Sequence, residues 1–230
     1  MTVLIETRGL SYRYPRRGEV LSKVDFTLKA GDRVALTGSN GAGKTTLLHL
    51  LVGLKKAKAG EIHAFGALRK EEKEFVEVRA RAGFLFQDPD DQLFCPTVLE
   101  DVAFGPLNLG KSRDEAMQIA HDALASVGLE GFEERITHQL SGGEKRMVTL
   151  ASVLAMEPEV LLLDEPSNAL DTKARWRLIN ILQDLPQAMI IISHDDDFLE
   201  HLANRRVRLE DARLIEDQHM TAPVLSAVTA

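Results

Sequence analysis

The sequence is poor in cysteine and in long apolar runs. Cys95 is the single cysteine among 230 residues, which excludes an internal disulfide and any metal site built from several cysteines. We expect this thiol to be buried or chemically inert. No uninterrupted apolar stretch reaches the roughly 18 residues that span a bilayer, and no apolar signal segment stands at the start. These absences predict a cytoplasmic chain without a membrane span.

Positive charge is also scarce. The sequence has 28 Lys and Arg residues against 35 Asp and Glu residues, and its formal net charge is −7. Because binding to the phosphate backbone of nucleic acids requires a broad basic face, we expect no direct nucleic-acid partner. The length fits a single α/β domain with an insertion, and two domains are the less favoured alternative.

A glycine-rich stretch is the strongest motif that the sequence does contain. Gly38 to Thr45 match the phosphate-binding pattern G-x-x-x-x-G-K-[ST] at every fixed position. We predict a buried strand before it, over residues 33–37, and a helix after it, over residues 45–52. Strand, loop and helix in this order predict a nucleoside triphosphate site, and a glycine-rich turn with a solvated lysine is the alternative.

The residues of this loop have separate expected roles. Gly38, Gly41 and Gly43 allow backbone angles that are closed to other residues, so that N–H groups and the helix N-terminus can surround phosphate oxygens. Lys44 would reach the β- and γ-phosphates, and the hydroxyl of Thr45 would be a ligand of Mg²⁺.

Two strand patterns precede the loop, over residues 3–14 and 24–28, and they predict an antiparallel piece of sheet. Tyr12 and Tyr14 are the only tyrosines, and their spacing places both rings on one face of a strand. Such a ring could stack on a nucleotide base, but packing within the protein is the favoured interpretation from the sequence alone.

Two further apolar strands end at polar residues, in the position where parallel sheets bind their ligands. Residues 83–86 precede Gln87, which could contact Mg²⁺ or a water, although a lone glutamine is usually a surface residue. Residues 160–163 precede Asp164 and Glu165. An aspartate there can hold the Mg²⁺ shell and a neighbouring glutamate can polarise an attacking water. The alternative is two solvated residues in a turn.

A third apolar strand is predicted over residues 189–192, followed by Ser193 and His194. His194 could donate a hydrogen bond to a γ-phosphate, although a single histidine is usually structural. The run Asp195–Asp197 is expected to cap the helix that begins near Phe198, and we assign it no metal.

From residue 88 to about residue 156 the strand signal disappears and three capping boxes predict helices: Thr97-x-x-Glu100, Ser112-x-x-Glu115 and Ser141-x-x-Glu144. In the third, Gly142 and Gly143 occupy the first helical turn, where each weakens the helix by about 1 kcal/mol relative to alanine. Because glycine is present despite this cost, we expect the backbone of this helix start to lie close to another group. An available hydroxyl and the amides of this helix start would form a second anion site.

The remaining patterns predict structure only. We expect a strand over residues 60–64, a solvated helical segment from Lys70 to Arg81, and a closing hairpin over residues 206–216. The small residues after Asp217 predict a poorly ordered tail.

In their order and spacing, these motifs resemble the ATPase subunits of ABC transporters, and the residues that carry the resemblance are Gly38–Thr45, Gln87, Leu140–Glu144, Asp164–Glu165, Ser167–Asp171 and His194. The resemblance covers about residues 3–216. It implies an α/β fold with a P-loop NTPase core of the ABC type, an N-terminal antiparallel β subdomain and an inserted helical subdomain. The implied ranges are about 1–87 and 157–217 for the core, about 88–156 for the helical subdomain and 218–230 for a flexible tail.

The resemblance also implies ATP and Mg²⁺ as ligands and assigns roles to residues. Adenine would stack on Tyr14, and the phosphates would contact Ser39, Asn40, Gly41, Ala42, Gly43, Lys44, Thr45 and Thr46. Mg²⁺ would be held by Thr45, Gln87 and Asp164. Glu165 would be the catalytic carboxylate, His194 the switch histidine, and Gln87 the residue that couples the site to a partner.

A head-to-tail dimer is implied as well. Ser141, Gly142, Gly143 and Glu144 of one subunit would close on ATP held by the loop of the other, which makes two composite sites. The partner would be a second copy or a paralogous ATPase subunit. Ser167–Asp171 departs mildly from the commoner version of its motif, which contains Thr and Gly, and this affects the expected subunit contact.

Within the family, residues 86–94 and 102–110 most resemble energy-coupling-factor ATPases of the cobalt and nickel uptake branch. They imply docking to integral membrane transport subunits at the cytoplasmic face of the cell membrane. An importer of a vitamin or another small solute is the alternative. A soluble ABC ATPase acting on ribosomes or DNA is disfavoured by the acidic charge, and a GTP switch or small-molecule kinase by the Leu140–Glu144 motif.

Overall fold

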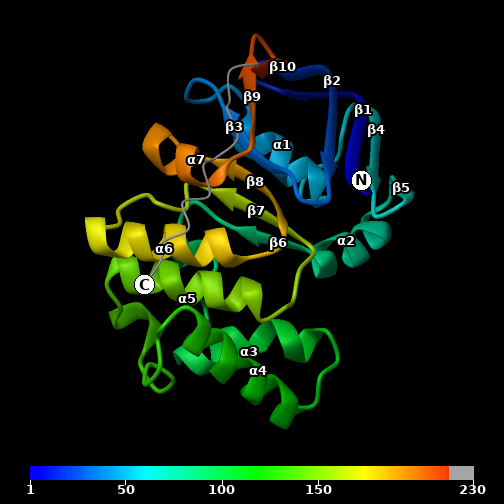
Figure 1. Cartoon of the computed structure of the whole chain (residues 1–230). Helices are drawn as coiled ribbons and strands as arrows, with labels where there is room; N and C mark the ends of the chain where they lie inside the picture. Colours follow the sequence, from blue (N-terminus) through cyan, green and yellow to red (C-terminus); the bar gives the residue numbers. More distant parts are fainter. Residues whose placement is uncertain (218–230) are drawn as a thin grey trace. The chain divides into compact units, whose positions relative to one another are not determined.

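The computed structural model describes residues 1–217, so the predicted tail lies outside the described residues. These residues form two compact units, which we describe separately: residues 1–69 together with the chain from residue 188, and residues 70–187. The helices and strands of both are labelled in Figure 1. The domain ranges given above stay a prediction.

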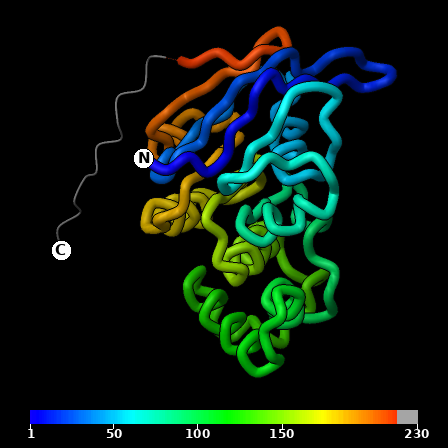
Figure 2. The backbone as a smooth tube through the Cα atoms, turned by 90° about the vertical axis from the view of Figure 1, so that its right-hand side faces the viewer, coloured from blue at the N-terminus to red at the C-terminus, as the bar shows by residue number. Residues whose placement is uncertain are grey.

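The first unit contains an antiparallel sheet with the strand order β2-β1-β4-β5. Its strands are β1 (Val3–Tyr14), β2 (Gly18–Lys29), β4 (Ala59–Ala64) and β5 (Ala67–Arg69). The predicted antiparallel sheet ahead of the glycine loop is therefore present, and β2 begins earlier than expected. Figure 2 shows the long β1–β2 hairpin in blue.

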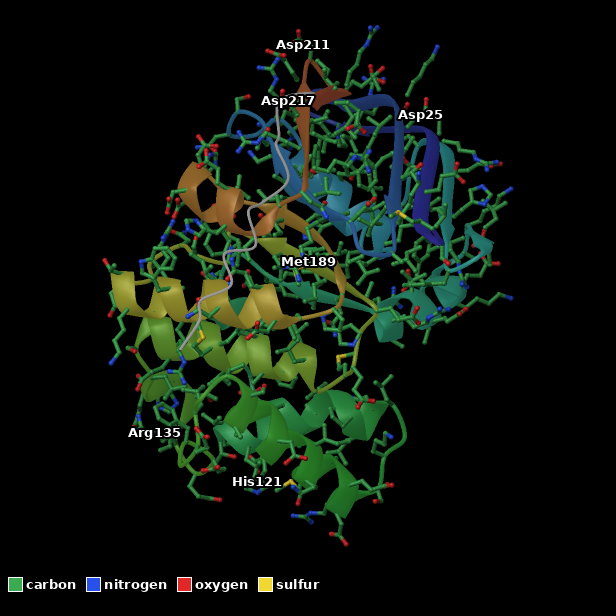
Figure 3. The ribbon with its side chains drawn as sticks, in the orientation of Figure 1. Asp25, His121, Arg135, Met189, Asp211 and Asp217 are labelled. Carbon is green, nitrogen blue, oxygen red and sulfur yellow. The ribbon has the colours of Figure 1, made fainter. Side chains whose placement is uncertain are left out.

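A second run of strands in this unit has the order β10-β9-β3-β8. Its strands are β3 (Arg33–Thr37), β8 (Ala188–Ile192), β9 (Arg205–Glu210) and β10 (Arg213–Asp217). β3 pairs in parallel with β8 and with β9, and β9 and β10 form the predicted antiparallel hairpin. Asp211, labelled in Figure 3, lies in the turn of this hairpin with a positive φ of 47°. The unit also contains α1 (Lys44–Leu51) and α7 (Asp196–Leu202).

The second unit contains two strands, β6 (Ala82–Leu85) and β7 (Val160–Asp164), which pair in parallel. Its α-helices are α2 (Phe75–Arg81), α3 (Val98–Asn108), α4 (Arg113–Ser126), α5 (Gly142–Leu154) and α6 (Thr172–Asp184). Short 3-10 turns lie at η1 (Glu72–Glu74), η2 (Pro89–Asp91) and η3 (Thr137–Gln139). Both hydrogen bonds of each predicted capping box, at α3, α4 and α5, are formed.

Burial follows the predicted apolar strands. All five residues of β7 and all five of β8 are buried. β6 is crossed closely by α5, because a Cβ at Gly83 would overlap Cγ1 of Val153. No helix among residues 1–217 is long and apolar enough to cross a membrane.

Candidate functional site

The glycine loop has the conformation that the motif predicts. Gly38, Gly41 and Gly43 have φ values of 138°, 79° and 116°, a range that glycine adopts far more readily than other residues. A Cβ at Gly38 would overlap the carbonyl oxygen of Leu209. Gly43 is the residue before α1, so the helix begins at Lys44. The loop therefore ends at a helix N-terminus whose N–H groups favour anions.

Lys44 forms hydrogen bonds within the loop, and Thr46 forms one with β1. The side chain of Lys44 is buried, and its Nζ donates to the carbonyl oxygens of Gly38 at 2.7 Å and of Ser39 at 3.2 Å. These carbonyls hold the ammonium group at the loop. The Thr46 hydroxyl shares a hydrogen bond of 3.0 Å with the hydroxyl of Tyr14.

Tyr14 is thereby placed beside the loop. Its ring also contacts Tyr12 edge to face, with centroids 5.1 Å apart, as their predicted shared face requires. Lys55 Nζ lies 5.4 Å from the centroid of the Tyr14 ring. Tyr14 therefore packs against other residues of the protein, as favoured from the sequence, and it also lies beside the nucleotide loop.

Asp164 and Glu165 lie at the end of β7 in the second unit. Asp164 is the last residue of the strand and is buried, whereas Glu165 is partly exposed. Glu165 has a φ of 50°, in the left-handed region. A non-glycine residue held there typically costs about 1 to 3 kcal/mol, and such strain concentrates at functional sites.

Gln87 is exposed after β6, and a buried arginine holds its backbone. Arg146, only 2% exposed on α5, donates to the carbonyl oxygens of Phe86 at 2.6 Å and of Gln87 at 2.5 Å. Burial lowers the pKa of Arg146, and the carboxylates of Asp88 and Asp164 oppose that shift.

Sequence reasoning missed Arg146. A signal was present, because Arg146 shares its helix face with the apolar residues Leu150 and Val153, which are buried on α5. A single arginine in an apolar stripe indicates a charge that is hydrogen-bonded inside the protein.

The helix α5 begins at the second predicted anion site. The Ser141 hydroxyl contacts Oε2 of Glu144 at 2.7 Å and accepts from the Glu144 N–H at 3.3 Å. The hydroxyl is therefore engaged in the capping box, which corrects the expectation that it is available. Hydrogen bonds from the Ser141 backbone and hydroxyl lower the pKa of Glu144.

Nothing among residues 1–217 requires glycine at positions 142 and 143. A Cβ at Gly142 would meet nothing within 4 Å, and one at Gly143 would meet only Leu170, at an ordinary 3.7 Å. Both residues have negative φ, since neither is among the described residues with positive φ. Their helix-weakening cost is therefore not offset by packing within the described chain.

His194 follows the buried Ser193 after β8 and is exposed. The Ser193 hydroxyl accepts from the N–H of Asp195, and Asp195 accepts from the N–H of Phe198 at 2.9 Å. The predicted capping of α7 by this acidic run is confirmed.

A buried carboxylate organises the segment before α3. Asp101 Oδ1 accepts from the backbone N–H groups of Phe94 at 3.1 Å and Cys95 at 2.9 Å. Burial raises the pKa of Asp101, and these N–H groups partly oppose the shift. Burial and the Asp101 charge raise the pKa of the Cys95 thiol to about 11. The partly buried thiol therefore stays protonated near neutral pH, which fits the expected inertness.

The same segment presents an apolar patch, which we define as Phe94, Phe104 and Leu107. These side chains are 65%, 44% and 43% exposed. The rings of Phe94 and Phe104 meet edge to face with centroids 4.7 Å apart. An exposed cluster of this kind typically marks an interaction surface.

A surface pocket of about 830 Å³ lies beside α6, and none of the predicted catalytic residues lines it. Its lining includes Leu154, Asp171, Trp176 and Arg177. Trp176 is the only tryptophan of the chain and is 42% exposed. Asp171 caps α6 by accepting from the N–H of Ala174.

Within each unit, the structure therefore brings together part of the predicted site. Tyr14 and the glycine loop are adjacent in the first unit. In the second unit, Arg146 joins the segment at Gln87 to the helix that begins after Ser141.

Comparisons with known proteins agree with these features. The model of the family described as ABC transporter matches residues 21–168. A protein of Brucella suis biovar 1, named for the ATP-binding proteins of ABC transporters, is 57% identical over 196 residues, which are 85% of this chain and 82% of that protein.

An energy-coupling factor transporter ATP-binding protein, EcfA of Methanocaldococcus jannaschii, is 42% identical over 218 residues, covering 93% of this chain and 78% of the relative. Among solved structures, cbiO1 of Clostridium perfringens, described as part of the ABC transporter complex cbiONQ, superposes with a TM-score of 0.83 at 32% identity. That match covers 94% of this chain and 88% of cbiO1.

Proposed function

Because the chain belongs to the ABC transporter family and is an ATPase with the ABC fold that uses ATP and Mg²⁺, we propose that it drives an importer of the energy-coupling-factor type. The relatives named for that transporter class support this assignment. ATP binding would close a dimer of ATPase subunits, and hydrolysis would reopen it. Integral membrane subunits would convert this cycle into movement of a solute.

The residues supply the chemistry that this activity requires. Lys44 compensates the charge of the β- and γ-phosphates, and the loop amides bind their oxygens. Mg²⁺ typically takes one or two protein oxygen ligands together with phosphate oxygens. The hydroxyl of Thr45, the carboxylate of Asp164 and the amide oxygen of Gln87 are donors of that kind. Glu165 orients and polarises the attacking water, His194 contacts the γ-phosphate, and Tyr14 stacks on adenine.

Gly142 and Gly143 are the observation that carries the dimer proposal. Neither packing nor backbone angle requires glycine at these positions inside the described chain. A second subunit provides the missing reason, because the phosphates of its ATP can approach a helix whose first two residues have no side chains. We propose that Ser141–Glu144 of each subunit complete the site of its partner, a second copy or a paralogue.

The variant Gly142→Ala tests this reading. A structural glycine would make alanine harmful to folding, whereas here alanine should stabilise the free chain by about 0.5 to 1 kcal/mol. The ATPase rate of the assembled complex should nevertheless fall at least 10-fold. A stabilised variant with normal ATPase activity would exclude a close approach of nucleotide to this residue.

Glu165→Gln tests the catalytic carboxylate, whose left-handed backbone supports a functional role. The variant should keep its affinity for ATP and lose turnover by the 10²-fold or more typical of a missing general base. The measurements are nucleotide binding by calorimetry and phosphate release by the purified complex. Near-normal phosphate release would remove Glu165 from this role.

The apolar patch is the proposed docking surface for a helix of an integral membrane subunit, and such docking would hold the chain at the cytoplasmic face of the cell membrane. Phe94→Ser should reduce co-purification with membrane subunits from solubilised membranes. Val76→Ser is the matched control, because Val76 is 60% exposed on α2, outside the patch. Equal recovery of both variants would argue against this surface, and co-purification with ribosomes would favour a soluble ABC ATPase.

Cobalt or nickel ion is the proposed cargo. The support is the resemblance of residues 86–94 and 102–110 to ATPases of that uptake branch, together with the structural likeness to cbiO1. Selectivity for the ion would reside in the membrane subunits. Uptake of radiolabelled cobalt and nickel, compared with vitamins, by vesicles containing the complex would decide between this cargo and another small solute.

A further inference from the structure

Arg17 lies in the turn between β1 and β2, yet its side chain reaches the glycine loop. Its Nη2 donates a hydrogen bond to the carbonyl oxygen of Gly41 at 3.0 Å. A Cβ at Gly41 would overlap this guanidinium group, so a larger residue there would displace the end of the Arg17 side chain. An arginine from outside the phosphate-binding pattern is thereby held against the middle of the loop.

Side chains of the β1–β2 hairpin form hydrogen bonds with the nucleotide loop and the helix that follows it. Tyr14 shares a hydrogen bond with Thr46 in the first turn of α1, and Arg17 bonds Gly41. A nucleotide whose base contacts Tyr14 and whose phosphates contact the loop amides would extend along the segment that carries Arg17. In that arrangement the guanidinium would lie near the path from base to phosphates.

The present acceptor of Arg17 is weaker than a phosphate would be. Hydrogen bonds between a guanidinium and a phosphate are charge-assisted and roughly twice as strong as neutral ones, and two can form in parallel. Arg17 is exposed, so a change of acceptor would not require burial of an unpaired charge. In a chain of net charge −7, a cation at this site also reduces repulsion of the polyphosphate.

We propose that Arg17 is a further binding residue for the phosphate chain of the nucleotide. On binding, its guanidinium exchanges the Gly41 carbonyl for an oxygen of the α- or β-phosphate. This inference rests on the proposed function, since it takes the loop as the ATP site.

The test compares Arg17→Ala and Arg17→Lys with Arg16→Ala, which removes the same charge from the neighbouring residue. The full chain is used with Mg²⁺, and melting temperatures confirm that each variant is folded. Affinity for ADP is measured by calorimetry, and affinity for inorganic pyrophosphate by competition with a fluorescent ADP analogue. Arg17→Ala should weaken both ligands about 10-fold, equivalent to about 1.4 kcal/mol. Arg17→Lys should recover part of the loss, and Arg16→Ala should bind like the wild type.

Other outcomes would overturn the proposal. Unchanged affinity for pyrophosphate in Arg17→Ala, even with weaker ADP binding, would place Arg17 at the ribose or in loop packing. Equal losses in Arg16→Ala and Arg17→Ala would show that net charge, and not contact, is responsible. If the wild-type chain bound neither ligand, the proposed function and this inference would fail together. Binding by the wild type with normal binding by Arg17→Ala would remove the inference alone.

Discussion

At the scale of single residues, the backbone conformation of Glu165 leads to a prediction about the free energy of unfolding. Its φ of 50° is more accessible to glycine than to residues with a Cβ. Glu165→Gly should therefore be about 1 kcal/mol more stable than Glu165→Ala, although both variants lack the carboxylate. Urea unfolding of the two proteins measures the difference. Equal stability would mean that the left-handed conformation stores no strain.

The buried carboxyl group of Asp101 leads to a second prediction at this scale, on how stability depends on pH. Burial raises its pKa from an ordinary 3.8, so the folded state binds a proton more tightly than the unfolded state does. The stabilisation from this proton is present at low pH and is lost as the pH rises from about 3.8 through the folded pKa. Asp101→Asn cannot titrate, so its deficit relative to the wild type should shrink as the pH rises through this window.

Urea unfolding of both proteins across the window measures this trend. The buried Oδ2 of Asp101 has no hydrogen-bond partner among the described residues, which agrees with a site that disfavours a carboxylate. A deficit that grows with pH would show that the charged form is the stabilised one.

The sequence allowed some of these residues to be predicted and not others. Asp164 and Glu165 stand out because two carboxylates directly follow an apolar strand, a local pattern. Arg146 and Arg17 bind backbone carbonyls that are 59 and 24 residues away in the chain. Such contacts depend on how elements pack, and local patterns do not encode them.

At the scale of elements, the helices α4 and α5 provide a matched pair. In both capping boxes the serine hydroxyl lies 2.7 Å from the glutamate Oε2 and accepts from the glutamate N–H at 3.3 Å. Ser112→Ala and Ser141→Ala should therefore each destabilise the chain by about 1 kcal/mol. Only Ser141→Ala should also lower the ATPase rate, because α5 alone begins at the proposed partner site. Equal ATPase rates would reduce Ser141 to a structural cap.

The same comparison shows why elements with complete local signals were predicted well. Capping boxes and apolar strands contain their signal within a few residues, and α3, α4, α5, β3, β7 and β8 were expected for that reason. Helix α6 was not predicted. Apolar residues do recur at helical spacing in it, at Ala174, Leu178 and Leu182. It lacks the capping box that indicated α3, α4 and α5, because Ala174 stands where the glutamate would be.

At the scale of the whole molecule, the proposed composite sites predict complementation between inactive subunits. Lys44→Ala removes the loop function, and Ser141→Arg blocks the helix start that is proposed to serve the partner. Each variant should be inactive alone. A mixture should recover up to roughly a quarter of the wild-type ATPase rate, since half of randomly assorted dimers are mixed and each retains one intact site. Failure of all mixtures, with dimers demonstrated by light scattering, would indicate sites formed within one chain.

Trp176 gives the molecule a single optical reporter. The intrinsic indole emission of the chain comes from one ring on α6, on the helix that Asp171 caps, with the guanidinium carbon of Arg175 5.7 Å from its centroid. Because the ring is partly exposed, its emission wavelength can shift in either direction when its exposure changes. A fluorescence change on adding nucleotide would therefore be assigned to α6 without any label. The chain can be followed through its catalytic cycle in its natural sequence.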